Sequence, residues 1–329
     1  MKKEAKYYQK IDESYIQCIL CPNLCKLKEN EIGNCKTRQN INGKLYQLFY
    51  NMASSIAIDP IEKKPLYHFY PGKKILSIGT VGCSFHCIFC QNYSISQYTD
   101  IHLEEIDPEF ILKILNEKKI NLLAFTYSEP LIWYETVYDI SKYIKEKNKE
   151  IKIVLVTNGY INSKPLIELL PYIDAMNIDL KSFQNDFYVK FCEGKLEPVL
   201  QTIKTSAKNI HVEVTTLVIP TLNDSEQEMS AISSFIASID ANLPLHISRY
   251  YPCYKMSIPP TDEAAIFKLV EVAKKSLNYV YAGNVWSKDD STYCSCGQKL
   301  IERHGFDTKI VGIKDGKCIK CGKHIYGKY

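Results

Sequence analysis

Three cysteines lie within eight residues of this chain, in the stretch Cys83-Ser-Phe-His-Cys87-Ile-Phe-Cys90. Thiols this close in sequence belong to one loop, which can turn all three sulfurs toward one centre. Soft thiolate ligands favour zinc, copper(I) or an iron–sulfur cluster, and a closed site for zinc or for four irons takes four protein ligands. His86 stands between two of the cysteines, where its ring does not turn inward easily. We therefore expect, in preference to a zinc knuckle, a four-iron cluster whose fourth iron has no protein ligand.

The chain has 329 residues and 13 cysteines, most of them in groups at short spacing. A disulfide framework is not expected in a cytosolic chain of this length, whereas short spacing is typical of metal sites. Cys192 and Cys253 stand alone, and we interpret them as thiols of the core or of a cleft wall. The other cysteines predict three separate metal centres.

The first group, Cys18, Cys21, Cys25 and Cys35, lies in a predicted N-terminal module of residues 1–45. Gly33 permits a tight turn just before the last of them. Four thiols in so short a segment close either a zinc site or a second iron–sulfur cluster, and the spacing does not choose between the two. Zinc would be structural, whereas a cluster could relay electrons or bind substrate at an open iron of its own.

The last group lies in a predicted C-terminal module of residues 288–329. It consists of two turns about twenty residues apart, Cys294-x-Cys296 and Cys318-x2-Cys321. Paired turns of this kind are typical of a zinc-ribbon or rubredoxin-like site holding zinc or iron. The first pair has one intervening residue where two are usual. We expect a structural metal clip.

The composition is that of a soluble globular protein, with 46% hydrophobic and 24% charged residues. The formal net charge of +4 is too small to argue for nucleic acid or for an anionic membrane as partner. The sequence shows no apolar run of membrane-spanning length, and its first residues lack the apolar stretch of a signal peptide. We expect a cytoplasmic protein that has no membrane partner.

Short apolar runs alternate with amphipathic stretches between residues 75 and 277. The predicted strands are 74–80, 121–127, 151–157, 175–180, 210–219 and 245–250. The predicted helices are 104–118, 134–149, 164–170, parts of 186–207, 225–239 and 261–277. Such alternation favours a parallel sheet with crossover helices. Six units predict an α/β fold, a partial (β/α)6 TIM-like barrel over residues 75–287, with the proline-containing segment 46–74 looping over the barrel.

Barrel enzymes carry their active residues at the carboxyl ends of strands. Glu129 follows the second predicted strand, although Glu also suits a helix cap there. Asn158 follows the third strand, and Asp179 and Lys181 end the fourth, either as ligand-binding groups or as a local ion pair. His246 lies in the sixth strand. These five residues are our candidates for binding a ligand in the cleft.

The spacing Cys-x3-Cys-x-Phe-Cys resembles the signature of radical S-adenosylmethionine (SAM) enzymes. The similarity extends over almost the whole chain, to AmmeMemoRadiSam-system radical SAM enzymes, which are relatives of pyruvate formate-lyase-activating enzymes. The segments that carry it are the N-terminal cysteines, 59–72, 82–92, 127–130, 281–284 and the C-terminal cysteines.

This resemblance implies a [4Fe-4S] cluster on Cys83, Cys87 and Cys90, with SAM bound to the free iron. An electron then cleaves SAM to methionine and a 5′-deoxyadenosyl radical, which abstracts hydrogen from an unidentified small molecule or partner protein. Glu129 would hold the SAM amino group, and Asn158 and the other strand-end candidates would help bind SAM. A low-potential electron donor of the ferredoxin or flavodoxin type, sensitivity to oxygen, and Memo-like and AMMECR-type partners are also implied.

One segment and one single position differ from the glycyl-radical activases among these relatives. Residues 59–64 read Asp-Pro-Ile-Glu-Lys-Lys where the activases carry Asp-Gly-Pro-Gly-x-Arg, and Val156 stands where they often have a cation-binding aspartate. The main hypothesis is therefore a radical SAM oxidoreductase, and a glycyl-radical enzyme-activating enzyme is the alternative. A third hypothesis is a zinc-rich interaction module, against which the low net charge and the barrel pattern count.

Overall fold

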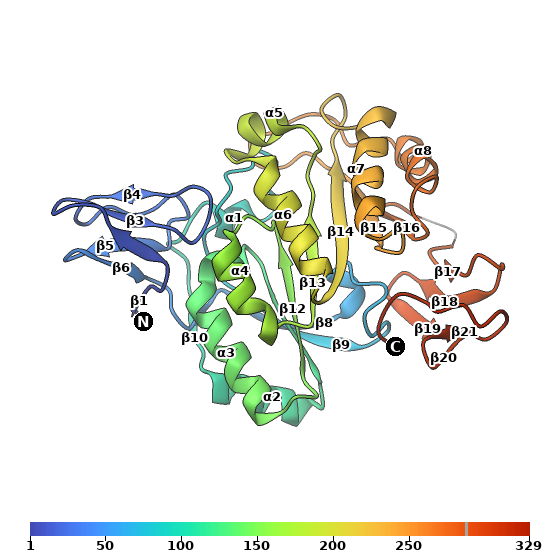
Figure 1. Ribbon diagram of the computed structural model, residues 1–329, viewed down its shortest axis with the longest axis horizontal. Helices are drawn as coiled ribbons and strands as arrows, with labels where there is room; N and C mark the ends of the chain where they lie inside the picture. Colours follow the sequence, from blue (N-terminus) through green and yellow to red (C-terminus); the bar gives the residue numbers. More distant parts are fainter. Residues whose placement is uncertain (287–288) are drawn as a thin grey trace.

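The computed structural model describes residues 1–286 and 289–329 (Figure 1). Its centre is an eight-stranded sheet in the order β16-β15-β14-β13-β12-β11-β9-β8. Neighbouring strands from β9 to β16 pair in parallel, and β8 (Ser55–Pro60) pairs antiparallel with β9 at one edge. The parallel strands are β9 (Lys74–Gly79), β11 (Leu122–Thr126), β12 (Lys152–Thr157), β13 (Ala175–Asp179), β14 (His211–Val218), β15 (Leu245–Arg249) and β16 (Val280–Gly283).

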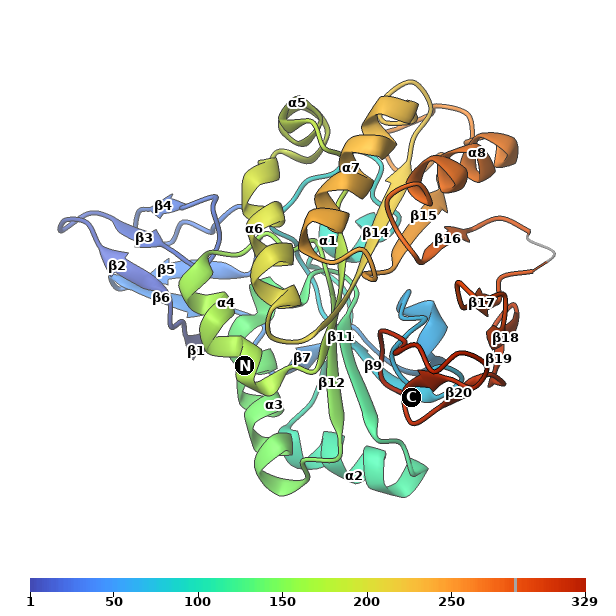
Figure 2. The same ribbon diagram turned by 45° about the vertical axis from the view of Figure 1, so that its right-hand side comes forward.

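Helices follow the strands, and Figures 1 and 2 show α3, α4, α6 and α7 on one side of the sheet. The alternation confirms the predicted α/β fold with a central parallel sheet, to which the structure adds β16 as a further parallel strand. The helices are α1 (Tyr93–Ser96), α2 (Pro108–Lys118), α3 (Tyr134–Lys147), α4 (Ser163–Leu169), α5 (Asn185–Phe187), α6 (Leu196–Ala207), α7 (Glu226–Ile239) and α8 (Glu263–Ala273). Within the described residues, no helix has both the length and the apolar character needed to cross a bilayer.

Helix α2 begins four residues later than predicted. Asp107 accepts a hydrogen bond from the backbone of Phe110, and Pro108 occupies the first helical position. Both residues favour a helix start at this point. The preceding Glu104–Glu105 forms strand β10, which pairs with β7 (Met52–Ala53).

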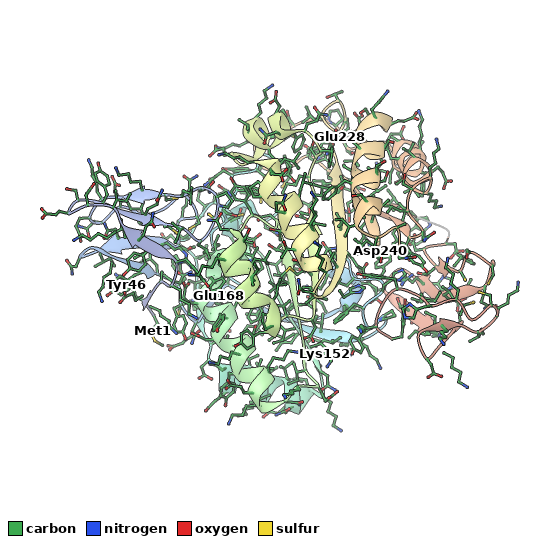
Figure 3. All side chains as sticks on the ribbon, in the orientation of Figure 1. Met1, Tyr46, Lys152, Glu168, Glu228 and Asp240 are labelled. Atoms are coloured by element: carbon green, nitrogen blue, oxygen red, sulfur yellow. The ribbon has the colours of Figure 1, made fainter. Side chains whose placement is uncertain are left out.

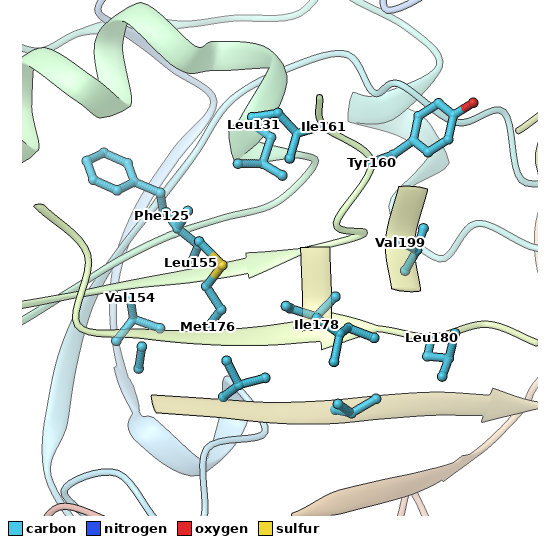
Figure 4. Close-up of a cluster of buried hydrophobic side chains, with 14 of the residues drawn as sticks. Phe125, Leu131, Val154, Leu155, Tyr160, Ile161, Met176, Ile178, Leu180 and Val199 are labelled. Carbon is cyan, nitrogen blue, oxygen red and sulfur yellow. The ribbon is translucent and has the colours of Figure 1, made fainter. Parts of the chain in front are cut away.

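The core consists of apolar side chains from neighbouring strands. Figure 4 shows Phe125 of β11, Leu155 of β12 and Met176 of β13 within one cluster. All three are fully buried. Each such side chain contributes roughly 1.5–3 kcal/mol by leaving water, so the strands form a rigid support for the loops at their ends.

The segment 46–74 is more regular than the predicted loop over the barrel. It contributes β7, β8 and a 3-10 turn at Ile61–Lys63. Pro60, the last residue of β8, has no N–H to donate, which is tolerated because β8 is an edge strand. The prolines of this segment are thus compatible with a strand at the edge of the sheet.

Two small sheets form the N-terminal part of the chain, which projects to the left in Figure 1. One sheet contains β2 (Tyr8–Lys10), β3 (Ile16–Cys18) and β4 (Lys26–Leu27), and the other contains β1 (Lys3–Glu4), β6 (Lys44–Gln47) and β5 (Arg38–Ile41). A buried ion pair of 2.5 Å joins Arg38 to Glu135 of α3. The Tyr7 hydroxyl donates to Glu168 of α4, which Figure 3 labels.

The C-terminal part contains β17 (Thr292–Tyr293), β18 (Lys299–His304), β19 (Asp307–Ile310), β20 (Ile313–Lys314) and β21 (Lys317–Cys318). The predicted boundary at residues 287 and 288 lies outside the described residues. The chain then returns to the segment before β9, where the backbone of Tyr70 donates to Lys328 and that of Lys328 donates to His68. Figure 2 shows the C-terminal part beside β9, with β20 near the C-terminus.

A buried carboxylate, that of Glu213 in β14, joins the segment before β9 to the central sheet. It accepts hydrogen bonds from the rings of His211 and His246 and from the backbone N–H groups of Tyr67 and His68. Burial alone would raise the pKa of Glu213, but the two imidazole hydrogen bonds hold it well below its usual range. The charge is therefore kept at neutral pH.

His68 is fully buried beside this carboxylate. Its Nδ1–H donates to the Tyr326 carbonyl at 2.7 Å, and its Nε2 accepts from the Tyr281 hydroxyl at 2.6 Å. Burial lowers the pKa of His68 to about 3, so the folded chain keeps this ring neutral. The unfolded chain protonates it near its ordinary pKa of about 6.5.

Acid should therefore weaken the fold through His68. As the pH falls below about 6.5, the unfolded chain gains a proton that the folded chain does not take up, so stability is lost. Between about pH 7.5 and 5.5 this difference amounts to about 1.4 kcal/mol. Urea unfolding at both pH values measures this effect. The free energy of unfolding of His68→Asn should fall by about 1.4 kcal/mol less between the two pH values than that of the original chain. Equal losses for the two proteins would contradict the assignment.

Candidate active site

A cavity of about 340 Å³ lies at the carboxyl ends of the central strands. Cys83, Cys87 and Cys90, on the loop that follows β9, all line it. The same cavity is lined by Glu129 after β11 and by Asn158 after β12. A concave site of this size at this edge of a parallel sheet is typical of ligand binding in α/β proteins.

Neighbouring segments hold the cysteine loop (residues 83–90) in place. The backbone N–H groups of His86 and Ile88 donate to Cys192 and Phe191, at the end of the helical turn Tyr188–Cys192. The His86 ring points to other partners, with Nδ1 2.7 Å from the Gln97 side-chain oxygen and Nε2 3.0 Å from the Asn34 carbonyl. His86 is thus occupied as a hydrogen-bonding group.

The donor set fits a four-iron cluster with one open position. Burial raises the pKa of Cys83 well above its ordinary value, and the Cys192 thiol together with burial does the same for Cys87. Thiolates in such a place require added positive charge, which bound iron supplies. Cys192 is fully buried and is not part of the cavity lining.

Glu129 is held rigidly in the cavity wall. Its carboxylate accepts hydrogen bonds from the backbone of Leu131 at 2.9 Å, the Thr157 hydroxyl at 2.6 Å and the backbone of Asn158 at 2.8 Å. Burial raises its pKa to about 7, and these hydrogen bonds oppose the rise. Glu129 also caps the following 3-10 turn through Leu131, which confirms the helix-cap interpretation, whereas its role in binding a ligand stays a prediction.

Asn158 connects this carboxylate to the cysteine loop. Its side-chain amide lies 3.1 Å from the Ser84 hydroxyl and 3.5 Å from the Cys83 sulfur. An amide donor beside a metal-binding thiolate orients the ligand and adjusts the electronic properties of the metal. The structure therefore places Asn158 next to a predicted iron ligand.

Asp179 and Lys181, at the end of β13, both line the cavity and form an ion pair of 2.9 Å with each other. This confirms the predicted local ion pair, whereas ligand binding by the two residues stays a prediction. Burial opposes the charge of Lys181, but the Asp179 carboxylate and the Cys87 thiol hold its pKa well above its usual range. The ammonium group is a fixed positive charge beside the cysteine loop.

His246 does not lie in the cavity, contrary to our prediction. Its ring donates to Glu213 at 2.7 Å and stacks on Tyr281. Ser248, two residues further along the same strand face, does line the cavity. Two residues advance a strand by about 6.6 Å, which separates the Glu213 layer from the open end of the sheet.

Some lining residues were not among the sequence candidates. Ser96 lies with its hydroxyl 3.2 Å from the Cys90 sulfur, and Asn284 follows β16. Position at a strand end could have indicated Asn284, but nothing in the local sequence distinguishes Ser96. The additional polar lining residues are Lys63, Gln91, Asn92, Ser96, Thr126, Tyr127, Ser128, Thr157, Thr215, Ser248 and Asn284.

The N-terminal cysteine group (Cys18, Cys21, Cys25 and Cys35) comes together in space. The backbone of Cys18 donates to the Cys25 carbonyl at 2.9 Å across the β3–β4 pair. Burial raises the pKa of Cys21 well above its ordinary value, and the neighbouring Cys18 and Cys35 thiols raise it further. The four thiols are therefore near enough to one another to interact electrostatically.

The tail cysteine group (Cys294, Cys296, Cys318 and Cys321) is tighter. All four sulfurs lie within 4.8 Å of one another, with 3.6 Å between those of Cys294 and Cys321 and 3.7 Å between those of Cys296 and Cys318. A tetrahedral zinc ion with its bonds of 2.3 Å separates its sulfurs by about 3.8 Å. The single-residue gap in the first pair thus does not prevent convergence.

Comparison with known proteins agrees with this geometry. Residues 77–231 match the family model of the radical SAM superfamily. An uncharacterized protein of Methanocaldococcus jannaschii is 42% identical over 333 residues, covering 98% of each chain. The chain belongs to the radical SAM superfamily.

Two less similar proteins match part of the chain. The pyruvate formate-lyase-activating enzyme of Clostridium pasteurianum is 26% identical over 48% of this chain and 67% of its own length. The structure of Streptococcus suis SuiB bound to S-adenosylmethionine has 14% identity and a TM-score of 0.51, over 68% of this chain and 53% of SuiB, and shares the fold. Superfamily membership implies an enzyme that uses a [4Fe-4S] cluster, SAM and a reductant for radical chemistry.

Replacing Glu129 by Gln should weaken SAM binding. Loss of one charged hydrogen-bond acceptor costs about 1.5–3 kcal/mol, or roughly 10- to 100-fold in Kd. Because the pKa of Glu129 is about 7 before SAM binds, SAM should bind the original chain more tightly at pH 8 than at pH 6, as the carboxylate becomes charged.

Anaerobic titration calorimetry on iron-loaded protein measures both effects. Glu129→Gln should lose the pH dependence and keep its iron. Asp186→Asn, which removes an exposed charge outside the cavity, should bind like the original chain. If Glu129→Gln bound SAM with unchanged affinity, Glu129 would not contribute to SAM binding.

Proposed function

We propose that this chain is an oxidoreductase that holds a [4Fe-4S] cluster on Cys83, Cys87 and Cys90 and cleaves SAM reductively. When bound, the cluster supplies the electron that converts SAM to methionine and a 5′-deoxyadenosyl radical. The radical abstracts hydrogen from an unidentified small molecule or partner protein. The parallel sheet serves as a partial (β/α)6 barrel around this site.

One observation carries the proposal: among the described residues, Cys83, Cys87 and Cys90 line a cavity together with a rigid carboxylate and an ion pair, and no other cysteine and no histidine lines it. Glu129 would accept hydrogen bonds from the SAM amino group. Asp179 offers a carboxylate to the ribose hydroxyls, and Lys181 offers an ammonium to the SAM carboxylate. Asn158 would orient Cys83.

Apolar lining residues would limit the access of water to the site. Phe85 and Phe89 are buried, and both line the cavity together with Leu217. Phe85 is fixed by the Tyr160 ring, whose centre lies 4.6 Å from its own. A dry cavity protects a reactive radical from side reactions.

Anaerobic reconstitution tests the proposal directly. The chain loaded with iron and sulfide, then reduced with dithionite, should form 5′-deoxyadenosine and methionine from SAM. The Cys83→Ala/Cys87→Ala/Cys90→Ala variant should form neither, because it lacks the ligands. Liquid chromatography with mass detection measures both products. A fully loaded original chain that forms no 5′-deoxyadenosine would refute the proposal.

A glycyl-radical enzyme-activating role is the second candidate, and the similarity to the Clostridium pasteurianum enzyme favours it. Its test is the appearance of a glycyl radical on a partner protein by electron paramagnetic resonance. The sequence at 59–64 and Val156 at the cavity favour a different target.

We further propose that the chain acts in the AmmeMemoRadiSam system, with Memo-like and AMMECR-type proteins as partners, in the cytoplasm and without oxygen. A low-potential ferredoxin or flavodoxin would supply the electron. The support is the sequence resemblance of the cysteine groups and of segments 59–72 and 281–284.

For the tail cysteine group we propose one structural zinc ion. The sulfur separations of 3.6 and 3.7 Å match a single tetrahedral ion. Metal analysis should find about one zinc per chain in the original protein. Cys321→Ser should lose most of it, whereas Cys253→Ser, which removes a thiol outside the group, should keep it. Iron in place of zinc would contradict this assignment.

A further inference from the structure

We propose that the N-terminal cysteine group holds a second iron–sulfur cluster, which passes electrons to the centre on the cysteine loop. The inference rests on the proposed function for the receiving centre. It assigns to residues 18–35 an electron-relay role in that reaction.

Four thiols close the ligand set of a cluster. Cys18, Cys21 and Cys35 are buried, and Cys25 is half-buried. A cluster with all its irons bound by protein has no free position for a substrate, so electron transfer is the function that remains for it. The tail group differs in that its four sulfurs lie within 4.8 Å of one another, a spacing that suits a single zinc ion.

A buried cation faces this group. Arg38 is 1% exposed, and its Nε and Nη1 atoms have no hydrogen-bond partner. Its Nη2 donates to Glu135. Glu135, Cys18 and Cys35 are the ionisable groups that lie close to its guanidinium group. Unpaired buried N–H groups of a guanidinium are costly, and the sulfurs of an anionic cluster would satisfy them.

The N-terminal group also lies directly against the cysteine loop. Asn23, between two of its ligands, donates to the Ser84 carbonyl at 2.8 Å, next to Cys83. The Asn34 carbonyl, next to Cys35, accepts from the His86 ring at 3.0 Å, next to Cys87. Each of these two hydrogen bonds thus joins a residue near a cysteine of the N-terminal group to a residue next to a cysteine of the cysteine loop.

The closest approach is between backbones. A Cβ atom at Gly82 would lie 2.3 Å from the Cys35 carbonyl oxygen. Gly82 also has a φ of 80°, which side chains disfavour. Cys83 follows Gly82 directly, so a short path of bonds and contacts runs from the last ligand of one group to the first ligand of the other.

The electron balance is simple. A ferredoxin-type donor is oxidised by one electron, and the N-terminal cluster is reduced. That cluster is then reoxidised as it reduces the cluster on the cysteine loop, which uses the electron on SAM. Neither transfer requires a proton or a further reactant.

The first test isolates the N-terminal centre. The Cys83→Ala/Cys87→Ala/Cys90→Ala variant, prepared anaerobically, should keep about four irons and four sulfides. It should also show a cluster signal by electron paramagnetic resonance after dithionite reduction. Adding Cys21→Ser and Cys25→Ser should abolish both, with circular dichroism and tail zinc content checking the fold. A second zinc ion in addition to the tail zinc, or no iron, in the triple variant would overturn the proposal, whatever the outcome for SAM cleavage.

The second test concerns Arg38 as a positioning residue. In the triple-alanine background, Arg38→Met/Glu135→Gln should shift the cluster potential to more negative values, because a neighbouring positive charge stabilises the reduced cluster. Glu135→Gln alone is the matched control and should leave Arg38 in place. Equal potentials for the two variants would show that Arg38 does not face the cluster.

The third test measures the relay. With the cysteine loop intact, Cys21→Ser/Cys25→Ser should still form 5′-deoxyadenosine with dithionite. With a reduced ferredoxin as donor, its rate should fall roughly tenfold or more, the scale on which loss of a supporting site acts. An undiminished rate with ferredoxin would overturn the relay role, while loss with both reductants would indicate a structural role and also overturn it.

Discussion

The parallel register of the central strands is the constraint on which the site depends. Backbone hydrogen bonds place Thr126 beside Gly79 and Thr157 beside Ile178, so the strand ends lie along one edge. The loops that leave this edge carry the three thiols, Glu129 and the Asp179–Lys181 pair. Because the strands are held by a fully buried core, these groups keep their separations without any direct contact between most of them.

Buried charges occur where separate parts of the chain join the sheet. Arg38 and Glu135 join the N-terminal sheets to α3, and Glu213 joins the segment before β9 to β14 and β15. A buried ion pair contributes little net stability but strongly penalises a partner that is misplaced. Such pairs therefore suit the positioning of the small cysteine-rich parts, whose own cores are too small to fix their orientation.

The six strand–helix units could be predicted from the sequence, because their strands are clear apolar runs and the apolar residues of their helices recur three and four positions apart. Strands β8 and β16 were missed for physical reasons. Strand β8 is bounded by proline and lies at an edge, and β16 has only four residues, so its pairing with β15 decides its conformation. For the cavity, strand-end position indicated four residues that line it, Glu129, Asn158, Asp179 and Lys181, while their binding of a ligand stays a prediction. It failed for His246, because alternation gives the face of a strand but not the depth along it. The closeness of residues 34–35 to residues 82–86 could not be predicted, since it depends on how two distant segments pack.

The close approach of the Cys35 carbonyl to Gly82 ties two distant segments of the chain together. The cysteine loop leaves β9 through Gly82, and one wall of that turn is the backbone of Cys35, which lies in the turn before β5. An insertion or deletion within residues 34–37 would therefore also displace the first residues of the cysteine loop, although the two segments lie far apart in the sequence.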